Sequence, residues 1–251
     1  MKATTPTMGM NRTGARTSPI LTRELIANTE LTPPSGEGGA QGISNVRIMY
    51  AQQGEKMGSI PPPASLKQAA STLAKAVAGR NMSVFVDKLG ERNAFERQGV
   101  RLYDGVISKH AAYGTWTGGP SLAELQHIRD EELQHFELCS EAIVSLGGDP
   151  TVVTPSANIH GVASMGLVQV ITDPRTTLLH ALEMVHIAEL ADNDCWETLA
   201  AIARAMGQDG LAEQFNEALK HEAEHLQMVR SWIAAALSSD AGSAVPPPTA
   251  H

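Results

Sequence analysis

The stretch SLAELQHIRDEELQHFELCSEAIVSL, residues 121–146, decides the fold. Its apolar residues recur at every third or fourth position, which predicts an amphipathic helix. Ser121 and Glu124 form a capping-box pattern at its start, and Gly147-Gly148 ends it. A glutamate and a histidine lie near its middle, so we expect a long helix that buries polar side chains.

Two Glu-x-x-His pairs are the main chemical signal in the sequence. Glu132 and His135 lie in the run EELQH, and Glu222 and His225 lie in the run HEAEH. Residues three apart share one helix face, so each pair points both side chains in the same direction. Carboxylate and imidazole ligands suit iron and manganese. The two pairs therefore predict a metal site that is built from two helices.

Three further helical patterns cover residues 83–112, 175–206 and 210–237. Each long helix has about 25–30 residues and is roughly 40 Å long. Such lengths are typical of helix bundles, and a chain that is 42% hydrophobic but only 4% aromatic suits packed helices better than a sandwich or barrel.

The links between these helices predict how they connect. Short loops at 114–120 and 207–210 join the first helix to the second and the third to the fourth, which makes two antiparallel hairpins. The link 147–174 is long enough to cross the whole bundle, and its apolar part, 161–171, predicts a short helix. The fold class that follows is an all-α antiparallel four-helix bundle with a long crossover between helices two and three.

The first and third helices each place a single glutamate at the level of the pairs. Glu96 shares an inward stripe with Leu89 and Tyr103, and Glu189 takes the equivalent place in the third helix. One Glu from each of two helices and Glu-x-x-His from the other two is the pattern of di-iron and di-manganese carboxylate bundles. The six predicted metal ligands are Glu96, Glu132, His135, Glu189, Glu222 and His225. Four carboxylates neutralise two cations, whereas burying them without metal is very costly.

Other polar residues leave alternatives open within this site. His186 is a candidate extra ligand, and Glu91 and Glu183 are alternative carboxylates for the first and third helices. Arg129 and Asp192 are candidates for orienting the ligands.

Two aromatic residues follow the single glutamates at the same spacing. Tyr103 comes seven residues after Glu96, and Trp196 comes seven after Glu189. They either pack in the core or have a catalytic role, as a hydrogen-bond partner of a ligand or as a redox-active neighbour.

Composition limits the partners and the compartment. The net charge of −8 and the pI of about 5.6, without a basic patch, exclude nucleic acid as a primary partner. The two cysteines form no CxxC pair, which fits a reducing compartment. No secretory signal and no apolar run of transmembrane length are present in the sequence, so we expect a cytoplasmic protein with no membrane partner.

The domain organisation follows from changes in composition. Residues 1–82 form an N-terminal arm that we expect to be mostly disordered, with a transient helix at 20–30 and a short amphipathic helix near 65–78. Residues 83–237 form the bundle, and residues 238–251, which contain three consecutive prolines, form a disordered tail.

These residues resemble the ferritin-like superfamily and, within it, the rubrerythrin-type di-iron carboxylate bundle. The resemblance covers about residues 84–237 and rests on the spacing of Glu96 and Tyr103 and on the paired Glu-x-x-His motifs. The chain is also similar to uncharacterised bacterial ferritin-like proteins with a run like DKLGER, residues 87–92, before the first ligand. The resemblance implies a homodimer or larger homo-oligomer.

The function that this resemblance implies is oxidoreductase chemistry in iron handling or oxidative-stress defence. Two iron ions would react with oxygen or hydrogen peroxide, as in a ferroxidase or peroxidase. The chain departs from the family at Trp196, where tyrosine is common, and it has no rubredoxin-like module with CxxC pairs. A peroxidase cycle would therefore need an external electron-donor protein.

Three other functions compete with this interpretation. A manganese catalase uses the same ligand types with two manganese ions. An iron-storage or cage-cargo protein would oxidise iron and pass it to a cage. A metal-free structural bundle would leave up to four buried carboxylates without partners.

Overall fold

The computed structural model describes residues 19–31, 39–60 and 82–248, and every regular element in these ranges is an α-helix. The helices are α1 (Pro19–Leu31), α2 (Gly39–Gln53), α4 (Met82–Tyr113), α5 (Leu122–Ser145), α6 (Pro155–Thr172), α7 (Leu178–Ala205) and α8 (Asp209–Ala241). The all-α class is therefore confirmed. None of these helices combines the length and the apolar character that crossing a membrane requires.

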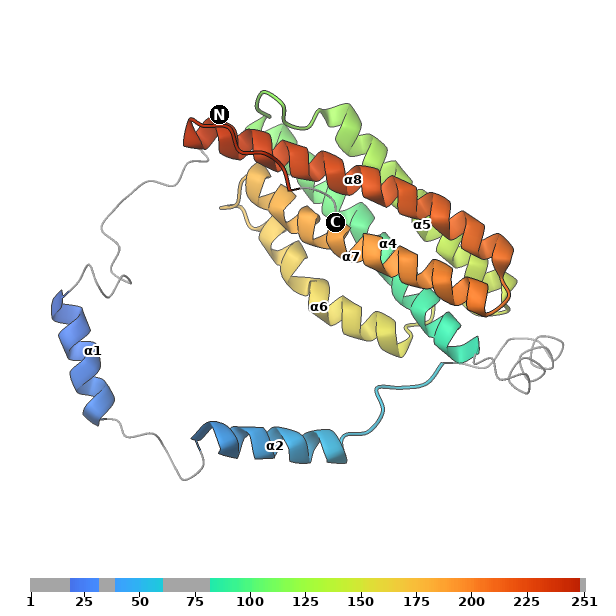
Figure 1. Ribbon diagram of the computed structural model, residues 1–251, viewed down its shortest axis with the longest axis horizontal. Coiled ribbons are helices and arrows are strands. Elements are labelled where there is room, and N and C mark those ends of the chain that lie inside the picture. The colour runs from blue at the N-terminus through green and yellow to red at the C-terminus, as the bar shows by residue number, and fades with distance from the viewer. Residues whose placement is uncertain (1–18, 32–38, 61–81, 249–251) are drawn as a thin grey trace. The chain divides into compact units, whose positions relative to one another are not determined.

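Four of the helices pack side by side around a common interior (Figure 1). Helix α4 packs against α5 and α7, and α8 packs against the same two helices. The shorter α6 connects α5 to α7 and lies against α4 and α7, so it covers that side. We call these five helices the bundle.

Capping residues set the ends of the bundle helices. The expected capping box of α5 is present, since Ser121 accepts from the Glu124 amide and Glu124 accepts from the Ser121 amide. Helix α7 begins at Leu178, three residues later than expected, because Thr177 accepts from the His180 amide and acts as the N-cap. Helix α8 extends past residue 237 to Ala241 and ends where Gly242 takes a left-handed conformation with φ 64°.

The crossover helix is longer than the sequence pattern predicts. We expected residues 161–171 to be helical, but α6 begins at Pro155 and ends at Thr172. Thr154 is the N-cap, and proline is well suited to the first helical position because its missing N–H would have no partner there. Thr154 and Pro155 lie before the apolar residues 161–171 from which the shorter helix was predicted, so the apolar pattern did not reveal where α6 begins.

The N-terminal arm contains two helices that belong to a separate compact unit, residues 5–57. Helix α1 matches the helix expected at 20–30, whereas α2 was not expected, because its sequence has only weak helical periodicity. The helix expected at 65–78 lies outside the described residues.

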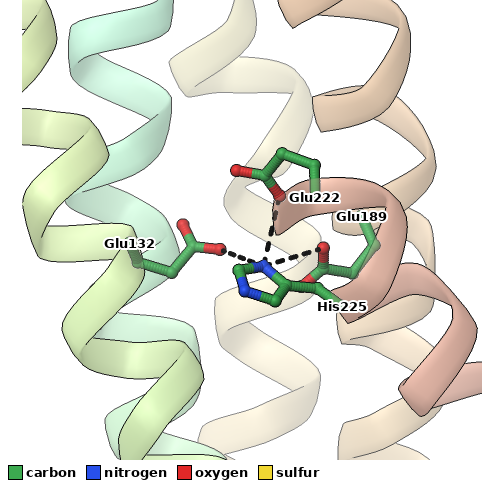
Figure 2. Close-up of side chains that lie close together, drawn as sticks. All are labelled: Glu132, Glu189, Glu222 and His225. Carbon is green, nitrogen blue, oxygen red and sulfur yellow. Dashed lines mark ion pairs between the residues drawn. The ribbon is translucent and has the colours of Figure 1, made fainter. Parts of the chain in front are cut away.

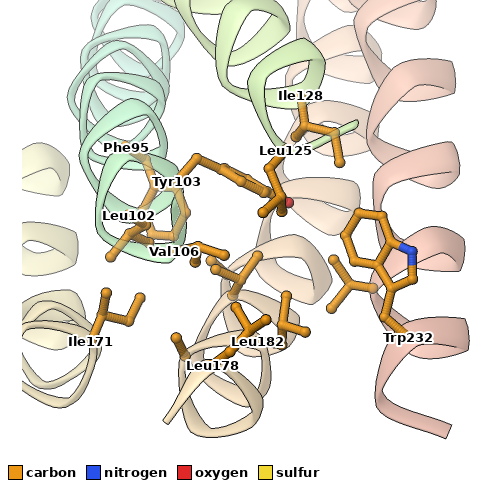
Figure 3. Close-up of a cluster of buried hydrophobic side chains, with 14 residues drawn as sticks. Phe95, Leu102, Tyr103, Val106, Leu125, Ile128, Ile171, Leu178, Leu182 and Trp232 are labelled. Atoms are coloured by element: carbon orange, nitrogen blue, oxygen red, sulfur yellow. The ribbon is translucent and has the colours of Figure 1, made fainter. Parts of the chain in front are cut away.

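Two hydrophobic clusters lie above and below a polar layer in the bundle. The cluster in Figure 3 contains Leu102, Leu125 and Trp232, and a second cluster contains Phe85, Cys139 and Phe215. On α4, Leu102 follows the polar layer and Phe85 precedes it; on α5, Leu125 precedes it and Cys139 follows it. The predicted ligands fall between these levels and are therefore shielded from water on both sides.

Candidate metal centre

All six predicted ligands lie in the polar layer, on four different helices. Each is buried, with no more than 3% of its surface exposed. They are Glu96 on α4, Glu132 and His135 on α5, Glu189 on α7, and Glu222 and His225 on α8. The shared helix face of each Glu-x-x-His pair brings both of its side chains into this layer, as the spacing requires.

Four of these residues form one group that could hold a metal ion: Glu132, Glu189, Glu222 and His225 (Figure 2). The Nδ1 atom of His225 lies 3.4 Å from Glu222 Oε2 and 3.8 Å from both Glu132 Oε1 and Glu189 Oε2. One ligand atom from each residue lies within 4.8 Å of the others. The four side chains point toward one another, so a single cation between them would be in reach of all four.

A second group consists of Glu96, His135 and Glu222. His135 Nδ1 lies 2.7 Å from Glu222 Oε1 and 3.7 Å from Glu96 Oε2. Glu222 belongs to both groups, and its two oxygens face different imidazoles. The two groups therefore share one carboxylate, which is the arrangement that a bridging ligand between two ions requires.

The inward-facing oxygen and nitrogen atoms are suited to bind a metal ion, because few of them form hydrogen bonds with one another. Glu132 Oε2, Glu189 Oε2, both Glu222 oxygens and the Nδ1 atoms of His135 and His225 have no well-oriented hydrogen-bond partner among the described residues. Buried polar atoms without partners are rare in folded proteins and call for an explanation such as an ion. The donor set of carboxylate oxygens and imidazole nitrogens is the set that iron and manganese accept.

The carboxylates are also electrostatically unfavourable without a cation. Burial raises the pKa of Glu132 and of Glu189 well above the usual value, and repulsion from Glu222 adds to this effect. Glu222 behaves in the opposite way: burial raises its pKa, but the close contacts with the imidazoles of His135 and His225 outweigh that effect and lower it. A divalent cation would stabilise the charged form of all three carboxylates.

Arg92 is a buried cation beside the two groups. It is 2% exposed, its Nε lies 2.5 Å from Glu96 Oε1, and its Nη2 forms a short ion pair with Asp192. Asp192 is equally buried, and burial raises its pKa despite the attraction of Arg92. This side chain pairs with the arginine, so it joins the polar layer without joining either ligand group.

Each of the two predicted ligand histidines has a polar side chain in contact with its Nε2 atom, on the side of the ring away from the carboxylates. His225 Nε2 lies 2.9 Å from Glu131 Oε2, and His135 Nε2 lies 3.3 Å from His221 Nδ1. Burial disfavours the charged form of His225, but the hydrogen bond to Glu131 and the close contact with Glu222 dominate and raise its pKa to about 10. Once a cation displaces the proton on Nδ1, an Nε2–H that donates outward leaves the Nδ1 lone pair facing the carboxylates, as metal-binding histidines require.

The two predicted aromatic residues border the site in different ways. The Tyr103 hydroxyl donates a short hydrogen bond to Glu189 Oε1, and burial together with the nearby carboxylates raises its pKa well above the usual value. Trp196 makes no polar contact with a ligand; it packs edge-on against His135 with ring centroids 5.5 Å apart. Tyr103 therefore contacts the predicted ligand Glu189 directly, whereas Trp196 only packs against the ring of His135.

Four of the alternative residues lie outside both groups. His186 is half-buried beside Arg230, and burial lowers its pKa. Glu183 and Arg129 are also half-buried, and Arg129 pairs with Asp130. The fourth residue, Glu91, is buried but pairs with Lys88 and His160. Of the two orienting candidates, Asp192 is the one that pairs with Arg92, which in turn contacts the predicted ligand Glu96.

Sequence reasoning gave no role to Arg92, Glu131, His221 or Gly99, all of which contact the ligand set or make room for it. Arg92 lies one helical turn before Glu96, so the signal was a charged residue on an otherwise inward stripe. His221 lies four residues before His225 and shares its face, which was visible in the run HEAEH.

No family model, curated protein or solved structure matches this chain. The structure shows an all-helical bundle with a buried Glu/His cluster that could hold a metal ion.

Proposed function

We propose that the bundle is ferritin-like and of rubrerythrin type, and that it holds two iron ions in a di-metal carboxylate centre. The chain would be a ferroxidase or peroxidase that reacts with oxygen or hydrogen peroxide, in iron handling or oxidative-stress defence. The observation that carries this proposal is the charge of the buried cluster.

The charges of the polar layer balance two divalent cations. Five carboxylates lie in it, each no more than 2% exposed: Glu96, Glu132, Glu189, Asp192 and Glu222. Among the described residues Arg92 is the arginine that pairs with them, so five ionised carboxylates and Arg92 with neutral histidines would carry a formal charge of −4. An uncompensated buried charge of this size strongly destabilises the ionised state, whereas two divalent ions cancel it.

The connectivity supports the same proposal. Helices α4 and α5 provide Glu96 and the pair Glu132/His135, and helices α7 and α8 provide Glu189 and the pair Glu222/His225. Helix α6 joins the two halves along the side formed by α4 and α7. Two similar halves that meet at one polar layer are the architecture of di-iron carboxylate bundles.

Each residue then has a defined task. Bound iron would supply the redox chemistry, because it can pass electrons to oxygen or peroxide. Glu222 faces both imidazoles and is suited to bridge, Glu131 and His221 fix the ring orientations, and Tyr103 holds Glu189 in place. The hydrophobic clusters on both sides keep bulk water out.

Reduction of peroxide over many turnovers would need a partner. The chain has two cysteines, Cys139 and Cys195, which are too few for a Cys₄ iron site of the rubredoxin kind. An external protein would therefore have to deliver electrons to the centre.

The test is elemental analysis of the full chain expressed with iron and manganese both supplied, combined with native mass and peroxide turnover. About two irons per chain with peroxide reduction or ferrous oxidation support the proposal. Two manganese ions with oxygen evolution from peroxide would replace it with manganese catalase. Many irons per chain in a large particle would replace it with iron storage.

Matched variants separate a ligand from a structural carboxylate. Glu132→Gln removes a charge from the cluster, while Glu137→Gln makes the same change at an exposed position on α5. We expect Glu132→Gln to lose bound metal and Glu137→Gln to keep it. A folded wild-type chain that holds well under one metal ion would refute the proposed centre.

A further inference from the structure

We propose that metal cations reach the centre through the seam between α5 and α8, along Glu131, His221 and His127. This inference rests on the proposed di-metal centre and adds a loading route to it.

The polar groups outside the two ligand histidines both lie in this seam. Glu131 is on α5 and contacts His225 on α8, whereas His221 is on α8 and contacts His135 on α5. The His135 and His221 rings are stacked, with centroids 5.5 Å apart. Every step inward across the seam therefore passes from one metal-binding type of side chain to another.

Exposure increases steadily outward along the same groups. The His225 side chain is 2% exposed, Glu131 is 15% exposed, His221 is 42% exposed and His127 is 70% exposed. Glu131 lies within ion-pair range of three imidazoles: His225 at 2.9 Å, His127 at 3.5 Å and His221 at 3.8 Å. A cation that approaches the seam thus meets oxygen and nitrogen donors from the surface to the buried ligands.

The opposite side of the bundle presents Arg92 to an approaching cation. Helix α6 covers α4 and α7 there, and Arg92 with Asp192 fills the interior behind it. A cavity of about 230 Å³ between α4, α6 and α7 does reach Arg92, and its lining includes Lys88, Glu91 and His160. In that lining Lys88 and Arg92 stand beside Glu91 and Asp194, and Glu91 is already paired with Lys88 at 2.6 Å and with His160 at 3.0 Å. Arg92 both lines this cavity and contacts Glu96, so a cation that entered here would have to pass a buried positive charge.

The experiment measures the loading rate of the metal-free full chain with Co²⁺, whose visible absorption develops on binding. The seam variants are His221→Ala, His127→Ala and Glu131→Gln. The matched controls are His160→Ala, which removes an imidazole from the opposite cavity, and Glu224→Gln, which makes the same charge change at an exposed position on α8. We expect His221→Ala and Glu131→Gln to load about tenfold more slowly than wild type and the controls to load at the wild-type rate.

A route and an orienting contact differ in their effect on release. A residue on the route speeds arrival and departure equally, so its loss slows both rates and leaves the affinity unchanged. A residue that only orients a ligand changes the affinity, chiefly by faster departure. His127 is the cleanest probe, because its ion-pair partner is Glu131 and it lies well away from the ligand atoms.

The outcomes separate the route from the centre itself. Slower arrival and departure in His127→Ala with two ions still bound at equilibrium, together with slower arrival in His221→Ala and Glu131→Gln, support the route. Wild-type rates in all seam variants, or equal slowing by His160→Ala, overturn the route while leaving the centre in place. No cobalt absorption even in the wild type overturns the proposed centre.

Discussion

Arg92 on α4 and Asp192 on α7 form an ion pair inside the bundle, and each is only 2% exposed. This pair breaks the similarity of the two halves. Four residues before the single glutamate, α4 has Arg92 where α7 has Val185; three residues after it, α4 has Gly99 where α7 has Asp192. The positive charge therefore lies on the side of Glu96, because Arg92 Nε is 2.5 Å from Glu96 Oε1.

We predict that the two ions bind with unequal affinity. An ion in the group of Glu96, His135 and Glu222 must compete with Arg92 for Glu96, whereas the group around His225 offers four ligands without such a competitor. The tighter ion should bind about tenfold or more strongly than the weaker one.

Titration of the metal-free protein with Co²⁺ or Mn²⁺ measures this difference. His135→Ala should keep the tight ion and lose the weak one, while His225→Ala should lose the tight ion. Two equal affinities in the wild type, or equal losses in the two variants, would contradict the prediction.

Gly99 makes room for Glu132. A Cβ built at Gly99 would overlap the Glu132 carboxylate, so Gly99→Ala should displace this ligand and weaken metal binding by about tenfold or more. Gly166→Ala on α6 is the control, because no atom lies within 4 Å of the added Cβ. That control should keep its metal and gain up to about 1 kcal/mol of stability, since alanine favours a helix over glycine. Metal affinity and thermal unfolding of both variants test this, and a Gly99→Ala protein with normal affinity would refute it.

Tyr103 should matter for affinity more than for folding. Its hydroxyl donates to Glu189 Oε1, and Tyr103→Phe removes that bond while keeping the ring in the hydrophobic cluster. We predict two bound ions with about 10-fold weaker binding at the group that contains Glu189. Competition with a chelator measures the change. The control is Tyr113→Phe at the end of α4, far from the ligand level, which should bind metal normally.

The six predicted ligands in the polar layer could be placed from the sequence because periodicity alone determines which helix positions share a face. The spacing of Glu132 and His135 requires that both point inward together, and four long helices of similar length bring such positions to one level. The level itself follows from the apolar residues on either side, such as Phe85 and Leu102 on α4.

The residues around the ligands could not be placed in this way. Whether Arg92 pairs with Glu96, Asp192 or solvent depends on how α4 is rotated relative to α7. Periodicity does not determine this rotation precisely enough to place a single side chain. Arg129 illustrates the same limit, because it lies one turn before Glu132 but its side chain points away to Asp130. The helical bounds of α6 and α7 depended on the caps Thr154 and Thr177, which apolar patterns do not reveal.

The stability of the metal-free chain should fall as pH rises. Burial raises the pKa of Glu96, Glu132 and Glu189 above the ordinary value of 4.5, so these groups hold protons in the folded state more tightly than in the unfolded state. A raised carboxyl pKa contributes stability that is present below 4.5 and is lost as pH rises through the folded-state pKa. Glu222 has the opposite sign, since its lowered pKa contributes stability above 4.5 that is lost in acid. The raised groups outnumber it, so the metal-free chain should melt at a lower temperature at about pH 8 than at about pH 5.

The metal-loaded chain should show the reverse dependence. Cations displace the protons from the same carboxylates, so binding strengthens as pH rises and stabilises the fold in proportion. Thermal unfolding between about pH 5 and pH 8, with chelator and with saturating Mn²⁺, tests both signs. Glu137→Gln, on the exposed face of α5, should leave both curves unchanged, while Glu189→Gln should flatten the metal-free curve because it removes one raised group. A metal-free protein whose melting temperature rises over this range would show that the buried carboxylates are already paired without metal, and it would remove the electrostatic basis for the proposed centre.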